Sequence, residues 1–254
     1  MSESKRRHEA PFFVGYLNSI PKPLATFLLV FAVCFSAGMG VAAFGLSSVQ
    51  PDPGDGAFRW GNRFEQTGYL EMRPYPVFRV AGENGEPDRT YMVSGQGKRG
   101  VFRQAEKYKD QAVTLRGVPL QRGDLTMVQV GRVRPSEDGA VAMSSNEATS
   151  LGKWRLTGEI CDGKCYAGAM RPGRGLAHKA CADFCLTGGV PPVFVSSGDV
   201  SGRNFFLLTD KNGELLGEEL KDLLALYIEV EGEVEQLDDL LVFKADLDTV
   251  RIIR

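Results

Sequence analysis

The feature that most constrains the fold of this chain is one long apolar run near its N-terminus. Residues 24–46 read LATFLLVFAVCFSAGMGVAAFGL and contain no charged side chain. As a helix that rises 1.5 Å per residue, the run spans roughly 34 Å, which is enough to cross a hydrocarbon core of about 30 Å. A buried helix of a soluble protein would show a polar face, and this run shows none. The sequence therefore predicts a single transmembrane anchor at 24–46.

The charges that flank this run predict its orientation. The N-terminal side carries basic residues, namely Lys5, Arg6, Arg7 and Lys22, whereas the C-terminal side, SVQPDPGDG, has two aspartates and no cation. By the positive-inside rule, residues 1–23 stay in the cytoplasm or at the membrane interface, and the rest of the chain is exported. The run is too long and starts too late for a cleaved signal peptide. We therefore expect a single-pass protein of the bacterial inner membrane with periplasmic soluble domains.

Beyond the anchor, two stretches of the chain show the same order of sequence signals. A linker rich in proline, glycine and aspartate (47–61) precedes the first copy (62–135), and a small, polar linker (136–153) separates it from the second copy (154–254). Each copy opens with a strand that contains Thr-Gly and continues with an apolar strand and a polar, partly helical connection. Each then closes with strands that are interrupted by a glycine and a turn. The repeat predicts two tandem domains of one fold.

The strand signals within each copy predict a small barrel. Gly117 and Gly232 fall in mid-strand, where a bulge would let a strand bend, and residues 122–124 and 237–239 occupy hairpin-turn positions. Five short strands with one helical connector resemble the OB fold, with an SH3-like barrel or a small sandwich as the alternatives. The predicted fold class is mainly β, with one N-terminal transmembrane helix followed by two tandem OB-fold-like small β-barrels.

The two copies carry charges of opposite sign. Residues 61–135 contain 13 Lys and Arg against 8 Asp and Glu, and residues 154–254 contain 11 against 17. Such segments either attract one another or face different partners. OB folds often bind nucleic acid through a basic groove with interleaved aromatic residues. The predicted topology places the basic copy outside the cytoplasm, so we expect no nucleic acid and instead a solvated face or a contact with acidic lipid or protein.

The second copy carries an insertion that the first copy lacks. Thr67 and Thr157 are 90 positions apart, but Gly117 and Gly232 are 115 positions apart, so about 25 extra residues lie in the second copy. They fall at 161–195, which contains four of the five cysteines, while the first copy has no cysteine. Because one copy folds without it, the insertion is expected to serve binding more than folding.

The spacing of the insertion's side chains fits a metal site. Cys181 and Cys185 are four residues apart on AHKACADFC, which places both thiols on one face if this stretch is helical, and His178 lies three residues before Cys181. Cys165 would complete a set of three thiolates and one imidazole, which suits zinc, copper or iron in tetrahedral geometry. Cys161 is a further candidate, as an alternative ligand or a disulfide partner.

Two other interpretations of the same residues remain open. In an oxidising compartment the two Cys-x3-Cys arms could form two structural disulfides, Cys161 with Cys185 and Cys165 with Cys181. A redox-active thiol pair is the third interpretation, but it is typical of a Cys-x-x-Cys motif at a helix start, and the sequence has none.

The segment 158–195 resembles a group of small exported bacterial proteins of OB-like build. In these proteins a strand Gly-Glu-Val-x-Asp-x-x-Cys-Tyr is followed by His-x-x-Cys-Ala-x-x-Cys and a Gly-x-Pro turn, and here the string is G-E-I-x-D-x-x-C-Y, H-x-x-C-A-x-x-C and G-x-P. The resemblance picks out Cys165, Tyr166, His178, Cys181 and Cys185. It implies three cysteines and one histidine, which favours a metal site over two disulfides. Cys161 departs from the pattern, and the group brings no assigned reaction.

The chain shows no nucleophile elbow, phosphate-binding glycine loop, HExxH motif or paired-carboxylate motif, so an enzyme is not expected. The single anchor, the duplicated barrel and the inserted ligand set together predict a membrane-anchored, non-catalytic accessory subunit of a larger, redox-type membrane complex, with protein partners and no small-molecule substrate. The alternative is a free-standing periplasmic protein for metal handling or thiol redox chemistry.

Overall fold

The computed structural model describes residues 20–49, 54, 56–82, 86–137, 143 and 147–253, and the chain divides into two compact units, residues 1–52 and 53–254. The first unit contains one helix, α1 (Lys22–Val49), whose stretch Lys22–Gly45 is long and apolar enough to cross a membrane. A signal sequence near an N-terminus satisfies the same criteria. The helix begins two residues before the predicted anchor and ends three residues after it. The predicted cytoplasmic or interfacial segment lies largely outside the described residues, which begin at residue 20.

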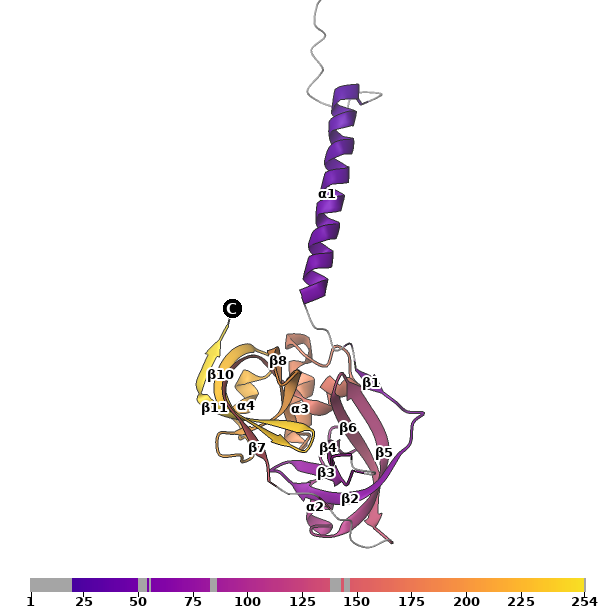
Figure 1. The fold of residues 1–254 in the computed structure, drawn as a ribbon, viewed down its shortest axis with the longest axis vertical. Coiled ribbons are helices and arrows are strands. Elements are labelled where there is room, and N and C mark those ends of the chain that lie inside the picture. Colours follow the sequence, from indigo (N-terminus) through magenta and orange to yellow (C-terminus); the bar gives the residue numbers. More distant parts are fainter. Residues whose placement is uncertain are drawn as a thin grey trace, which may run out of the picture. The chain divides into compact units, whose positions relative to one another are not determined.

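The second unit is built from strands with short helices between them (Figure 1). The first copy contains β2 (Phe64–Met72), β3 (Pro76–Val80), β4 (Arg89–Ser94), α2 (Phe102–Lys107), β5 (Ala112–Arg122) and β6 (Leu125–Pro135). The second copy contains β7 (Thr149–Asp162), β8 (Pro192–Val200), β9 (Arg203–Asp210), α4 (Leu220–Leu223), β10 (Tyr227–Leu237) and β11 (Leu240–Ile252).

The two copies have the same strand topology. In the first copy β2, β3 and β4 pair in antiparallel order, β4 pairs with β6 in parallel, and β5 closes the barrel by pairing with both β6 and β2. In the second copy β7, β8, β9, β11 and β10 form a closed barrel in the same order, and β9 pairs with β11 in parallel. In each copy the short helix lies between the third and fourth strands. This is the OB-like arrangement that the sequence predicts, and the predicted fold class is confirmed.

Two pairs of equivalent glycines show why the copies bend alike. Register shifts adjoin Gly117 in β5 and flank Gly232 in β10, as the predicted bulges require. A side chain at Gly68 would overlap the Arg79 carbonyl oxygen, and one at Gly158 would overlap that of Val195. Each bent strand runs unbroken through its glycine, so the prediction that Gly117 and Gly232 lie in mid-strand is confirmed.

The strands extend into three segments that the sequence places outside the barrels. A short strand, β1 (Ala57–Phe58), pairs with β5 although it falls in the predicted linker 47–61. Strand β7 begins within the predicted linker 136–153, where it pairs with β10. The β7–β8 ladder includes the pair Cys161 and Val193, so the excursion from the barrel covers residues 163–191 and not 161–195.

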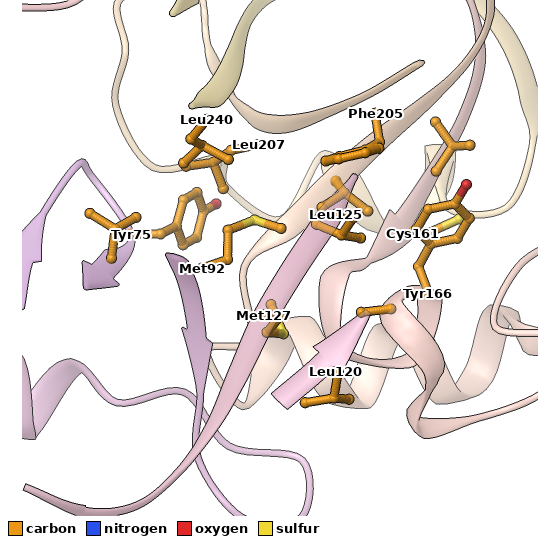
Figure 2. Close-up of a cluster of buried hydrophobic side chains, with 14 of the residues drawn as sticks. Tyr75, Met92, Leu120, Leu125, Met127, Cys161, Tyr166, Phe205, Leu207 and Leu240 are labelled. Atoms are coloured by element: carbon orange, nitrogen blue, oxygen red, sulfur yellow. The ribbon is translucent and has the colours of Figure 1, made fainter. Parts of the chain in front are cut away.

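The two barrels pack face to face through one shared apolar cluster. Figure 2 shows Tyr75 and Met92 of the first barrel close to Leu207 and Leu240 of the second. The two barrels contribute equivalent positions to this cluster. Met92 pairs with Met127 in the first barrel, and Leu207 pairs with Val242 at the corresponding place in the second. OB folds commonly bind ligands on this face, formed by the second and third strands. Here each barrel covers that face of the other.

A buried ion pair joins the barrels at the edge of this cluster. The Arg79 side chain is 1% exposed, and its Nε and Nη2 donate to the two carboxylate oxygens of Asp238 at 2.7 and 2.9 Å. Thr90 Oγ1 also donates to Asp238, at 2.6 Å. Asp238 lies in the β10–β11 turn, so the hairpin tip of the second barrel is held against β3 and β4 of the first.

Candidate metal centre

Residues 163–191 fold into three short helical turns beside the second barrel. Cys165 opens a π-helical turn, η2 (Cys165–Ala169), immediately after β7, and His178 ends a 3-10 turn, η3 (Leu176–His178). Helix α3 (Lys179–Thr187) follows, and it carries Cys181 and Cys185 one turn apart on the same face. The η2 turn and the continuous η3–α3 segment thus bring their side chains to one place.

Two pairs of cysteine sulfurs have the separation that a tetrahedral metal ion imposes. Cys165 Sγ lies 3.9 Å from Cys181 Sγ and 3.9 Å from Cys185 Sγ. Zinc–sulfur bonds of about 2.3 Å at tetrahedral angles place two sulfurs about 3.8 Å apart. In the described residues, ligand atoms within 4.8 Å of one another form two groups, Cys165 with His178 and Cys181, and Cys165 with Asp162 and Cys185. The Cys/His group can therefore hold a metal ion.

A buried carboxylate orients the histidine. His178 Nε2 lies 2.9 Å from Asp162 Oδ2, and both side chains are almost fully excluded from solvent. The other carboxylate oxygen accepts the Cys165 amide at 2.8 Å. Metal-bound histidines usually have such a carboxylate partner on the nitrogen that faces away from the ion. Asp162 therefore holds the His178 ring through Nε2, and it fixes the turn that carries Cys165.

Two lysines lie at the site, Lys98 in contact with the sulfurs and Lys164 in contact with backbone carbonyl oxygens, and the sequence did not identify them. Lys98, from the loop between β4 and α2, places Nζ 2.6 Å from Cys181 Sγ and 3.6 Å from Cys185 Sγ. This bond to Cys181 raises the pKa of Lys98. Lys164 is buried, donates to the carbonyl oxygens of Gly95 and Gly97 at 2.7 Å each, and has its pKa lowered by burial.

The sequence signal for the Lys98 contact is the glycine-rich string GQGKRG at 95–100. Gly100 donates its amide to the Gly188 carbonyl oxygen at 2.8 Å, and a side chain at Gly188 would overlap the Lys98 carbonyl oxygen. Only glycine lets the two backbones approach so closely. The first barrel therefore contributes a loop to the site of the second.

The thiols of Cys165 and Cys185 influence one another's ionisation. Their sulfurs lie 3.9 Å apart, and either thiol can donate to the other. This contact raises the pKa of Cys165 and lowers that of Cys185. Burial opposes the ionisation of both thiols, while Lys98 favours the thiolate of Cys185. Of the two, Cys185 is thus the thiol whose surroundings favour the thiolate.

Cys161 lies apart from the other three cysteines of the insertion. Its Sγ donates to Glu159 Oε1 at 2.9 Å, it packs with Tyr166 in the cluster between the barrels, and burial raises its pKa. In the described residues it belongs to neither ligand group. All five cysteines are free thiols, so the structure gives no support to the pairing of Cys161 with Cys185 and Cys165 with Cys181.

Tyr166, which the resemblance also picks out, is a structural residue of the interface between the barrels. Its ring is 1% exposed and lies 4.4 Å beneath the guanidinium of Arg122, at the β5–β6 turn of the first barrel. This cation–π contact stabilises the packing of η2 against that turn. Tyr166 thus holds the Cys165 turn in place and does not join the ligand groups.

A cavity of about 560 Å³ opens beside the sulfurs. Its walls include Cys165, Cys185, Lys98, Lys164, Phe58, Trp60 and Met170. Met170 Sδ lies 3.2 Å from Cys181 Sγ, which makes it a fifth potential donor that the sequence did not identify. The only sequence signal for Met170 is its position five residues after Cys165.

The chain matches no protein-family model, no curated protein and no solved structure.

Proposed function

We propose that this protein is a membrane-anchored, non-catalytic accessory subunit that carries one metal ion on Cys165, His178, Cys181 and Cys185. In this proposal α1 crosses the bacterial inner membrane with its N-terminus in the cytoplasm, and the two barrels lie in the periplasm, docked on a larger membrane complex of redox type. The observation that supports the metal is that Cys165 lies at ligand spacing from His178 and Cys181 in one group and from Cys185 in the other.

The chemistry of the donor set supports a bound ion. Three buried or half-buried thiols this close together would repel one another as thiolates, and a cation removes that repulsion. Zinc, copper and iron all accept a tetrahedral set of three sulfurs and one nitrogen. When bound, the ion would hold η2, η3 and α3 together, and a copper or iron ion would also supply an electron-accepting centre.

The fold supports an accessory role. In each barrel the face that usually binds ligands in OB folds is covered by the other barrel. The insertion therefore provides the surface that a pair of barrels without it would lack. Residues 163–191 contain four basic residues and one acidic residue in an otherwise acidic copy. Leu176 and Phe184, at the start and middle of the site's helical turns, are 69% and 65% exposed. A basic surface with exposed apolar side chains suits a docking contact with an acidic partner.

Elemental analysis combined with thiol counting tests the metal. The full chain, purified in detergent, is expected to contain one metal ion per chain, and the thiols of Cys165, Cys181 and Cys185 should become reactive to alkylation only after chelation. Cys165→Ser should lose the ion, whereas Cys34→Ser, in α1, should keep it. Two disulfides and no metal would exclude this part of the proposal.

Native purification tests the accessory role. A tagged full chain extracted in mild detergent should migrate with at least one further membrane or periplasmic protein, and Phe184→Asp should release that protein without loss of metal. Migration alone, with metal lost and regained reversibly, would instead favour a free-standing metal-handling or thiol-redox protein.

A further inference from the structure

The thioether of Met170 adds a soft sulfur donor beside the cysteine and histidine ligand groups. The Met170 Sδ to Cys181 Sγ distance of 3.2 Å brings a second kind of sulfur to the ligand groups. The backbone on either side of Met170 is fixed, because Gly168 packs on the backbone of Ala57 and a side chain at Gly173 would collide with the Cys165 carbonyl oxygen. Both glycines have positive φ angles, 132° and 72°. The loop thus holds the thioether over the sulfurs.

We infer that the ion of this site is copper(I) and that Met170 is one of its ligands. The inference rests on the proposed metal site and names its metal. Thioether sulfur binds copper(I) well, but it is a poor ligand for the harder zinc and iron(II) ions, which take thiolate and imidazole.

The cavity provides the route by which a soft ion reaches the sulfurs. Its walls combine Met170 and the apolar rings of Phe58 and Trp60 with the sulfurs of Cys165 and Cys185. Met170 is 44% exposed, and the sulfur of Cys185 is buried behind it. A thioether at the mouth of the cavity can therefore take a copper(I) ion from solution and pass it to the thiolates. A metal site needs a path by which the ion can reach its ligands, and this cavity provides one.

Metal competition on the full chain in detergent tests this inference. The apoprotein is titrated anaerobically with copper(I) against a chromogenic copper(I) chelator, and separately with zinc against a zinc chelator. Met170→Leu keeps the size of the side chain and removes the thioether. It is expected to weaken copper(I) binding by roughly tenfold to a hundredfold, the effect typical of losing a supporting ligand, and to leave zinc binding unchanged.

The matched control is Met72→Leu. Met72 is an exposed methionine at the end of β2 in the first barrel, 40% exposed, and its substitution should change neither affinity. X-ray absorption on the copper(I) form should show one sulfur scatterer fewer in Met170→Leu than in the wild type.

Equal copper(I) affinities for the wild type and Met170→Leu would overturn the inference while leaving the metal site intact. A site that binds zinc but releases copper(I) to the chelator would overturn it as well. A wild-type chain that binds neither metal would instead overturn the proposed function itself.

Discussion

The two barrels of this protein share one topology and differ mainly in one connection. In the first barrel residues 73–75 join β2 to β3, whereas in the second residues 163–191 join the equivalent strands β7 and β8. Both connections face the opposite barrel: Tyr75 of the short one and Tyr166 of the long one lie in the same cluster. The difference shows that the barrel needs no insertion to close, and that the insertion adds a ligand set without changing the strand order.

The comparison also separates two kinds of buried polar group. Arg79 and Asp238 hold the barrels together, and their bonds are complete within the protein. The thiols of Cys165, Cys181 and Cys185 are close to one another, and Lys98 contacts two of them from the other barrel. The first group stabilises the fold, and the second provides a site. Four measurements can break or sharpen this distinction, in order of decreasing effect.

The largest effect is expected from Asp238→Ala. This change leaves the buried Arg79 guanidinium without its bidentate partner, and removing one member of a buried pair costs roughly 3–5 kcal/mol of unfolding free energy. Urea unfolding of the full chain in detergent measures the loss. Asp248→Asn, which breaks an exposed contact with Lys211, is the matched control and should leave the stability unchanged. Equal effects of the two substitutions would show that the hairpin contact does not join the barrels.

Metal binding is expected to stabilise the second barrel by a smaller amount. At an ion concentration one hundred times the dissociation constant, binding to the folded state adds about 2.7 kcal/mol to the unfolding free energy. Thermal unfolding with and without the ion should show this gain in the wild type and in Cys161→Ser, because Cys161 lies outside both ligand groups. Cys165→Ser should show none. A gain that also disappears in Cys161→Ser would place Cys161 among the ligands.

The equivalent glycines test whether the two barrels are under the same packing constraint. Gly68→Ala and Gly158→Ala each place a methyl group against a carbonyl oxygen of the neighbouring strand, so each should cost about 1–3 kcal/mol. Gly198→Ala, in β8, meets no atom within 4 Å and serves as the control. Unfolding curves that show a large cost in one barrel and none in the other would contradict the equivalence of β2 and β7.

The smallest effect is a pH dependence at the hairpin tip. Burial raises the pKa of Asp239, against the opposing effect of the Thr90 amide that donates to it and of the nearby Arg203 and Arg89. A carboxyl with a raised pKa in the folded state contributes stability below its unfolded pKa and loses that contribution as pH rises through the folded pKa. Asp239→Asn keeps the acceptor for Thr90 and removes the charge.

This substitution should therefore stabilise the chain slightly at neutral pH, and the gain should vanish below the ordinary aspartate pKa of about 3.9. Asp124→Asn, at the equivalent and exposed position of the first barrel, should give no such pH-dependent difference. A gain of equal size at both positions, measured by unfolding across the pH range, would show that burial of Asp239 is not the cause.

Much of the fold could be predicted from the sequence because each element has a local pattern. The apolar run of α1, the repeated Thr-Gly strands and the mid-strand glycines Gly117 and Gly232 all depend on near neighbours in the chain. The face-to-face packing depends on contacts between distant segments. Its one local sign was the continuous apolar run Phe205, Phe206, Leu207 and Leu208, which indicates that both faces of β9 are covered, since a half-exposed strand alternates.

The candidate site was predictable only in part for the same reason. Cysteine and histidine at 165, 178, 181 and 185 are rare residues at short spacing, so sequence alone groups them. Lys98 approaches from the other barrel, and Met170 is placed by two glycines with positive φ angles. Asp162 belongs to the motif, but the sequence predicted only that it lies on a strand. The glycine-rich string at 95–100 marks a close backbone approach near Lys98 but not its partner, and no short-range pattern distinguishes Met170 or Asp162 from ordinary surface or strand residues.

The position of Lys98 has a mechanical consequence. Its loop belongs to the first barrel, yet its ammonium group lies against sulfurs that belong to the second. Any force that slides one barrel along the other would withdraw a positive charge from the sulfurs while every ligand stayed in place. The affinity of the site for its metal ion would then depend on the alignment of the two barrels.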